Sequence, residues 1–305
     1  MMPSGTKIAS AVAITDTTLP LFNPDLAMPV ASSRAAKGLL GIWDMNHSYT
    51  PSAAGAATGL AIPNAAWEDA AALLGSGTSS SLAATFTTDS GHVAGTTSAF
   101  ERTSKGGLHG IVSQTNITAA DQGAYILLPS AIRTYLLANL THNYFVSVWS
   151  RITRVAASGS SSLLLAAIQN NASPAANYLV RLHGDAAGVK QNGVGLGSAS
   201  LLAINTLGND YSEFGASGQV GTVTSSSFNP GMYWGSTSKA GASQNSNSGN
   251  FNKAPSWIFY RMHLEDLTVS GRTFAQAAIA DQAAWTLAFG AGGRFNGDTF
   301  TTPAI

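Results

Sequence analysis

The fold of this chain is decided by a stretch near its C-terminal end, which reads Trp257-Ile258-Phe259-Tyr260-Arg261-Met262-His263-Leu264-Glu265-Asp266-Leu267-Thr268. Neighbouring side chains on a strand point to opposite faces of the sheet. Alternate positions therefore give an apolar set, Ile258, Tyr260, Met262 and Leu264, and a mixed set, Phe259, Arg261, His263 and Glu265. The pattern predicts a strand in a sheet that packs on one face only, with His263 at the surface or in an interface.

A second strand is expected at residues 144–152, where aromatic and β-branched side chains fall on both faces. Further strand-like segments follow at residues 163–168, 178–182 and 230–235. The tripeptide His183-Gly184-Asp185 is expected to form a turn, and the Gly-rich segment 235–250 is expected to be a mobile loop with little to pack. These turn-separated strands favour an antiparallel sheet structure.

Two helical pieces interrupt the strands. Residues 64–74 predict a short helix with Asn64 as its N-cap. Thr273 and Gln276 form a capping-box pattern that predicts a helix after the strand expected at 257–268. Asp281 falls within the apolar stripe of that helix, so we expect it to cap a second helical piece over 282–289. Many short strands with little helix predict an all-β chain folded as a two-sheet antiparallel sandwich.

Composition narrows the class of protein. The chain has 305 residues, of which 45% are hydrophobic and only 10% charged, so a large core is available and the surface is polar but mostly uncharged. The net charge is zero and no basic patch stands out, which gives nucleic-acid binding little support. The absence of cysteine excludes disulfides, thiolate metal sites and a cysteine nucleophile. No segment approaches the roughly 20 apolar residues of a membrane span, and we identify no secretory signal.

The first 37 residues predict an extended arm. Pro3, Pro20, Pro24 and Pro29 interrupt any helix in this segment. Two interpretations stay open: the arm docks onto a neighbouring subunit or particle, or it wraps over its own domain. We therefore divide the chain into an arm over 1–37 and a β domain over 38–305.

The side chains that could support catalysis do not form a recognisable pattern. Glutamate occurs only at positions 68, 101, 213 and 265, without the spacing that would place paired carboxylates around a glycosidic bond. The neighbours Glu265 and Asp266 would point to opposite faces of a strand. The chain has no Gly-x-Ser-x-Gly elbow, and its six histidines are scattered. We predict no catalytic residues.

Three segments, in order, resemble the concanavalin A-like, or laminin-G-like, jelly-roll domains of tailed-phage virion proteins. They are the opening stretch 38–46, the middle strands 144–152 and 178–185, and the strand–turn–helix ending 257–298. The resemblance implies a virion structural or adhesion protein, in a tail fibre, a baseplate or a capsid accessory, rather than an enzyme. It also implies assembly with other virion proteins through the arm and a homo-oligomer, most often a trimer. The alternative function is a carbohydrate-binding, lectin-like protein or a capsid decoration protein.

Jelly-roll lectins stack loop aromatics on sugar rings, and the resemblance therefore gives two candidate sites for a host surface glycan. Asn209, Asp210 and Tyr211 form one candidate, and Tyr233 and Trp234 form the other, although strand aromatics often belong to the core.

Calcium is the metal that this fold family suggests. Asp185, Asp210 and Asp298 lie in loops that contain Gly or Asn and could offer oxygen ligands. Dense Asp-x-Asp-x-Asp loops are absent, and turn-forming aspartate is the simpler interpretation. We expect no metal and no cofactor.

Overall fold

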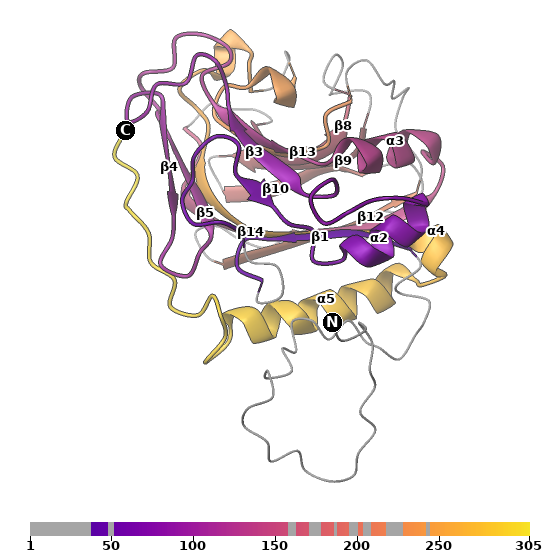
Figure 1. Cartoon of the computed structure of the whole chain (residues 1–305). Helices are drawn as coiled ribbons and strands as arrows, with labels where there is room; N and C mark the ends of the chain where they lie inside the picture. The colour runs from indigo at the N-terminus through magenta and orange to yellow at the C-terminus, as the bar shows by residue number, and fades with distance from the viewer. Residues whose placement is uncertain are drawn as a thin grey trace.

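The computed structural model describes residues 38–47, 52–157, 163–170, 178–185, 188–194, 201–203, 209–217, 228–241 and 245–305. They form two seven-stranded antiparallel sheets with a few helices (Figure 1). The predicted all-β class and the two-sheet antiparallel sandwich are thereby confirmed. The expected arm, residues 1–37, lies outside the described residues.

Sheet A contains the two strands that the sequence marks most strongly. Its order is β11-β12-β7-β14-β5-β4, and β1 also pairs with β14. The strands are β1 (Leu39–Asp44), β4 (Ser98–Arg102), β5 (Leu108–Val112), β7 (Asn143–Arg154), β11 (Leu201–Ala203), β12 (Asn209–Ser217) and β14 (Ser256–Asp266). The closing strand β14 therefore lies at the centre of the sheet, paired with β7 along one edge and with β1 and β5 along the other.

Sheet B has the order β10-β9-β8-β13-β6-β3-β2. Its strands are β2 (Ala61–Ile62), β3 (Ala84–Thr88), β6 (Ala124–Leu127), β8 (Leu163–Gln169), β9 (Tyr178–Asp185), β10 (Gly188–Val194) and β13 (Gly231–Trp234). The expected turn at His183-Gly184-Asp185 is wrong, because these residues continue β9. His183 and Gly184 pair with β8 on one side and with β10 on the other, so the sheet determines their extended backbone.

Large aromatic side chains fill the space between the sheets. Trp234 of sheet B and Trp257 of sheet A are buried and stack with ring centroids 4.5 Å apart and an interplanar angle of 14°. Each indole N–H donates to a backbone carbonyl of the opposite sheet, Trp234 to Trp257 and Trp257 to Tyr233, both at 3.1 Å. Gly110 makes room for this pair, since a Cβ there would lie 2.2 Å from the ring of Trp234.

The helices are α2 (Trp67–Leu74), α3 (Ser130–Ala138), α4 (Leu267–Ser270) and α5 (Phe274–Phe289), with 3-10 turns η3 (Ser238–Ala240) and η4 (Ser248–Asn250). Helix α5 lies across the outer face of sheet A (Figure 1). Among the described helices, none combines the length and apolar character that crossing a membrane requires.

Because α5 covers the outer face of sheet A, all eleven residues of β14 are buried. The prediction of a sheet packed on one face only is therefore wrong, and so is the surface position expected for His263, which is 2% exposed. The mixed face is polar because it carries an internal polar cluster beneath the helix, and not because it faces solvent.

A bulge in β14 also changes the predicted assignment of faces. The pairing with β7 shifts between Phe259 and Arg261, which leaves Tyr260 as the extra residue. A bulge adds one residue to the strand and so exchanges the two faces beyond it. Met262 and Leu264 do pack in the core between the sheets, but Ile258 and Tyr260 lie beneath α5.

The predicted helix caps are partly confirmed. The capping box of Thr273 and Gln276 is present at the start of α5. However, α5 continues unbroken through Asp281, so the expected second helical piece is wrong. Asn64 is not the N-cap of α2, a position that Ala66 occupies. The Asn64 amide instead accepts from the Ile42 N–H and donates to the Leu40 carbonyl, which fastens the segment before α2 to strand β1.

The segment 235–250 contributes to the interior, apart from residues 242–244, which lie outside the described part. Ala240 is buried, and the buried Asn245 amide bonds to both the N–H and the carbonyl of Leu164 in β8. The expectation that this segment has little to pack is therefore wrong. A single amide that satisfies both backbone groups of one residue substitutes for a strand pairing there.

Candidate functional site

The five residues predicted to bind a sugar do not form one exposed site. Tyr233 and Trp234 are 0% and 1% exposed, so neither ring offers a face for stacking. Asn209, Asp210 and Tyr211 open strand β12, where their backbones pair with Arg151, Ser150 and Trp149 of β7. The side chains of these three residues lie outside the described part of the structure, and their role in binding stays a prediction.

The outer face of sheet A holds the first of two polar clusters, directly beneath α5. Asp281 of α5 is at its centre and is 2% exposed. Its carboxylate accepts hydrogen bonds from the Ser147 hydroxyl at 2.5 Å, the Trp149 indole N–H at 3.0 Å and His263 Nδ1 at 2.9 Å. Arg261 Nη2 lies 3.0 Å from the same carboxylate, and its guanidinium stacks over the Trp149 ring at 4.1 Å.

This cluster explains why a helix with an aspartate in its apolar stripe is not interrupted there. Burial alone would raise the pKa of Asp281, but Arg261 and the hydrogen bond from His263 outweigh it and hold the pKa well below its usual range. Burial alone would lower the pKa of His263, but Asp281 and Glu265 outweigh it and raise that pKa. The buried charges thus stabilise one another and hold α5 against strands β7 and β14.

The residues next to this cluster are paired as well. The Glu265 carboxylate receives Arg272 Nη1 at 3.0 Å and lies 3.6 Å from His263 Nε2. Asp266 points away from this group: it caps α4 and accepts from Tyr135 Oη at 2.7 Å and from His142 Nδ1 at 2.6 Å. These separate partners agree with the prediction that Glu265 and Asp266 point to opposite faces of the strand.

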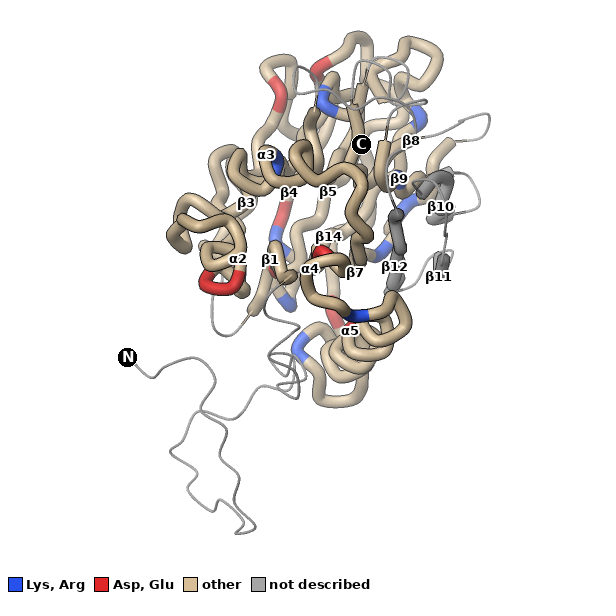
Figure 2. Tube along the Cα trace, turned by 90° about the vertical axis from the view of Figure 1, so that its right-hand side faces the viewer, with Lys and Arg blue, Asp and Glu red and all other residues tan. Residues whose placement is uncertain are grey.

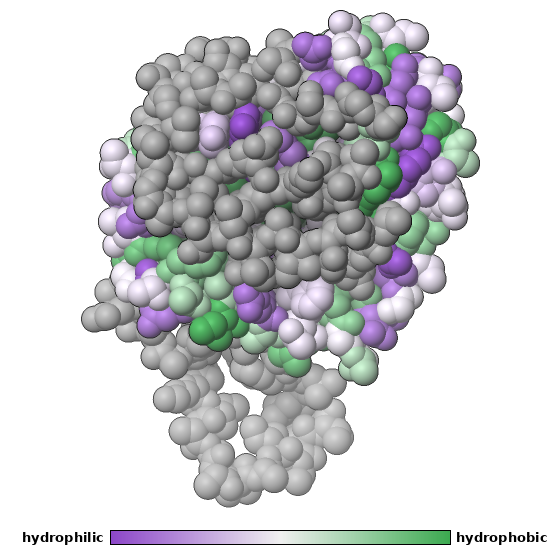
Figure 3. Space-filling model, turned by 180° about the vertical axis from the view of Figure 1, so that it is seen from behind, coloured by the Kyte–Doolittle hydropathy of each residue, from purple (hydrophilic) through white to green (hydrophobic). Residues whose placement is uncertain are grey.

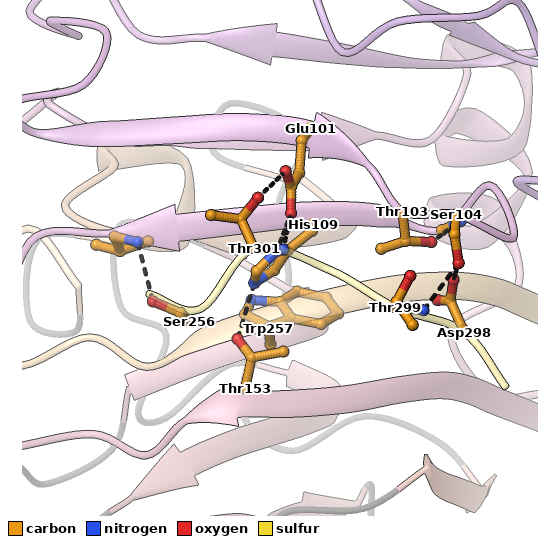
Figure 4. A network of polar contacts seen from close by, with 12 residues as sticks. Glu101, Thr103, Ser104, His109, Thr153, Ser256, Trp257, Asp298, Thr299 and Thr301 are labelled. Atoms are coloured by element: carbon orange, nitrogen blue, oxygen red, sulfur yellow. Dashed lines mark hydrogen bonds and ion pairs between the residues drawn. The ribbon is translucent and has the colours of Figure 1, made fainter. Parts of the chain in front are cut away.

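The second polar cluster brings together a carboxylate, an imidazole and a hydroxyl (Figure 4). His109 Nδ1 lies 2.9 Å from Glu101 Oε1, and His109 Nε2 lies 2.8 Å from Thr153 Oγ1. A carboxylate only accepts, so Nδ1 carries the proton and Nε2 accepts from the threonine hydroxyl. These three residues come from strands β4, β5 and β7.

The order of these groups is the order in which a hydrolase activates a hydroxyl nucleophile. Burial lowers the pKa of His109 despite the neighbouring Glu101, which keeps the imidazole neutral near pH 7. Burial would raise the pKa of Glu101, but hydrogen bonds from Thr301 and His109 outweigh it and lower that pKa. The ionisation states are therefore compatible with a general base, and access to the site decides whether it can act.

The C-terminal tail lies over this cluster, where the His109 side chain is fully buried and the Glu101 side chain stays 31% exposed. The Thr301 N–H and hydroxyl each donate to one oxygen of Glu101 at 2.7 Å. The Phe300 ring makes a T-shaped contact with His109, with centroids 5.2 Å apart, and the Arg151 guanidinium lies over the Phe300 ring at 4.7 Å. Figure 4 shows the tail passing over the strands, with Thr301 beside Glu101 and Thr299 beside Ser104. The cluster, as folded, fastens the tail to sheet A.

Asp298, one of the three aspartates considered for calcium, fastens the same tail. Its carboxylate accepts from Tyr260 Oη at 2.8 Å, from the Lys105 N–H at 2.7 Å and from Ser104 Oγ at 3.1 Å. Within the described residues, no group of three or more His, Cys, Asp or Glu side chains is placed to hold a metal ion. The side chains of Asp185 and Asp210 lie outside the described part, so their placement stays open.

Sequence reasoning did not identify either polar cluster. Asp281 follows Ser147 by 134 positions, and Thr301 follows Glu101 by 200, so no local spacing connects the partners. One signal was available: an aspartate inside an apolar helical stripe requires a buried partner, and the mixed face of β14 supplied Arg261 and His263.

No model of a known protein family matches this chain, and no curated protein matches it. Among solved structures, the chain is similar to Trypanosoma rangeli sialidase in complex with 2,3-difluorosialic acid, a covalent intermediate, with 12% identity and a TM-score of 0.34. The match covers 78% of this chain and 34% of the sialidase chain, so this chain spans about a third of that protein's length. A likeness at this level says nothing about substrate or reaction.

Proposed function

We propose that this chain is a structural and attachment protein of a virion, in a tail fibre, a baseplate or a capsid, which uses its β sandwich for assembly. One observation supports the non-catalytic role above the others. Both groups of polar side chains on the outer face of sheet A are hydrogen-bonded to a segment that packs on the sheet, one to α5 and the other to the C-terminal tail. Their hydrogen bonds hold these two segments on the sheet, so the polar groups stabilise the fold.

The location in a virion rests on the resemblance of the segment 257–298 to phage jelly rolls. The low charge supports the same role, because a chain with only 10% charged residues and no net charge has weak electrostatic protection against association. In this proposal the arm over 1–37 contacts other virion proteins, and the domain forms a homo-oligomer. The number of copies, three, comes from the resemblance.

The decisive experiment is a reconstruction of the intact particle with an antibody fragment bound to this chain. We expect several copies at symmetry-related positions, with arms that touch neighbouring subunits. Absence of the chain from purified particles, or a single copy whose arm stays on its own domain, would refute the proposal.

Catalysis is tested separately on purified protein with a panel of esters and polysaccharides. Thr153→Val removes the hydroxyl and keeps its shape, so it serves as the probe, and Thr268→Val on α4 serves as the matched control. We expect no turnover, or a background that both variants share. Turnover lost in Thr153→Val alone would show that the cluster beneath the tail is an active site.

A further inference from the structure

The outward face of α5 carries no charge although it lies at the surface. The helix has 16 residues, and its one charged residue, Asp281, points inward. The outward positions are Ala275, Gln276, Ile279, Ala283, Thr286 and Leu287. Figure 2 shows α5 free of charged positions over most of its length. Gln276 and Thr286 are the polar members of this face and the other four are apolar, whereas the exposed face of a surface helix is normally rich in charged and polar residues.

Exposed apolar side chains gather on the same part of the molecule. Four large hydrophobic residues are exposed among the described residues, and three of them, Val269, Ile279 and Leu287, belong to α4 or α5. Ile279 is 69% exposed and Leu287 is 48% exposed. The fourth, Val93, stands apart in the loop before β4. In Figure 3, hydrophobic residues are interspersed with hydrophilic ones along the lower edge of the molecule, the edge at which α5 lies in Figure 1. Apolar patches, unlike single apolar residues, mark interaction surfaces.

The spacing along α5 indicates which partner fits. Ala275, Ile279, Ala283 and Leu287 follow one another at intervals of four residues and alternate small with large. If a second α5 runs antiparallel across this one, a two-fold axis between positions 279 and 283 places each large residue opposite a small one. Ile279 then faces Ala283 of the other copy at the crossing point, and Leu287 lies on the same side as Ala275 where the two helices begin to diverge. A parallel pair would instead place Ile279 against itself and leave gaps beside the alanines.

The charge distribution also favours a second copy of this chain. A two-fold contact places every side chain near symmetry-related copies of its neighbours. A face that carries charges of one sign therefore repels the same face of the second copy. The uncharged face of α5 avoids this repulsion, and the polar Gln276 lies opposite Thr286 of the other copy. We propose that α5 is a self-association surface, on which a second copy of this chain packs its own α5 in the antiparallel direction.

The size of the contact limits its strength. A 16-residue helix is about 24 Å long, and ridges spaced by four residues pack at a crossing angle of about −50°, so the helices diverge on either side of Ile279 and Ala283. Such a crossing buries well under the roughly 800 Å² per partner of a stable interface. Free chains therefore associate weakly, and the pair forms mainly where copies are held close together. Since the contact is two-fold, it joins neighbouring oligomers and does not close a trimer.

Sedimentation of the full chain over a range of concentrations tests the surface. Ile279→Asp places a charge at the crossing point, and Val93→Asp is the matched control, since Val93 is also exposed, at 51%, but stands apart from α5. We expect wild type and Val93→Asp to associate equally and Ile279→Asp to associate at least about tenfold more weakly. Equal association of the two variants, or a wild type that stays monomeric at every concentration, overturns the proposal. Circular dichroism of each variant verifies that it is folded.

Cysteine pairs test the direction, because the chain has no cysteine of its own. Under mild oxidation, a mixture of Ile279→Cys and Ala283→Cys chains should form a mixed disulfide faster than Ile279→Cys chains alone. The reverse order would show a parallel pair. Protection of Ile279→Cys from a maleimide at all concentrations, without any crosslink between chains, would show that the chain's own arm covers α5. Either result overturns the proposal. Because these measurements use purified protein, they do not depend on where the protein is located.

Discussion

Replacing Asp281 with alanine should be among the most destabilising single changes in this domain. The substitution removes four contacts at once: those with Ser147, Trp149, His263 and Arg261. Arg261 is 3% exposed, and its Nε and Nη1 have no hydrogen-bond partner among the described residues. Loss of the carboxylate therefore leaves the buried Arg261 cation without its ion-pair partner, for which the expected cost is about 3–5 kcal/mol. That is a large part of the roughly 5–15 kcal/mol of a typical domain.

Urea unfolding followed by tryptophan fluorescence measures this cost, since the buried Trp149 reports on the region directly. Asp69→Ala, in the first turn of α2, is the matched control, and we expect it to cost below about 1 kcal/mol. Asp281→Asn keeps the volume but removes the charge, and it should fall between wild type and Asp281→Ala. If Asp281→Ala costs no more than the control, the cluster does not hold α5 against sheet A and the reasoning is wrong.

Four further outcomes follow from the same structure. Because the pKa of His263 is raised in the folded state, its protonated form adds stability that is fully present below a pH of about 6.5 and is lost as the pH rises through the folded-state pKa. His263→Gln should flatten that decline in a pH series of urea midpoints. Leu264→Ala should cost about 2–5 kcal/mol in the same assay, because the side chain is fully buried between the sheets, and a change below about 0.5 kcal/mol would contradict its placement. Burial raises the pKa of Asp89 to about 6, so stability should fall as the pH rises from about 4 to 6, and Asp89→Asn should remove this fall and gain about 1–2 kcal/mol at pH 7; an unchanged pH profile would refute the assignment. Glu101→Gln should loosen the tail, seen as faster hydrogen exchange at Thr301 with little change at Leu264, and unchanged exchange at Thr301 would show that the tail is held elsewhere.

The sequence by itself determined the class of fold and the positions of its principal strands. The alternation over 257–266 and the dense apolar run over 144–152 predict β14 and β7, because the two-residue period of a strand is local and needs no knowledge of the partner. The capping box of Thr273 and Gln276 is local in the same sense, and α5 begins there as predicted.

The tertiary structure alone decided which faces are buried and which polar residues meet. The bulge at Tyr260 depends on the pairing of β14 with β7, so a fixed alternation could not place Ile258. The burial of His263 depends on a helix that follows it in the sequence and returns across the sheet, and the Glu101 cluster depends on a tail 200 residues away. The alternation of polar and apolar residues in the sequence shows only which side chains are polar. Whether that polarity faces water or a buried charge is set by contacts between distant segments, and those contacts exist only once the chain has folded.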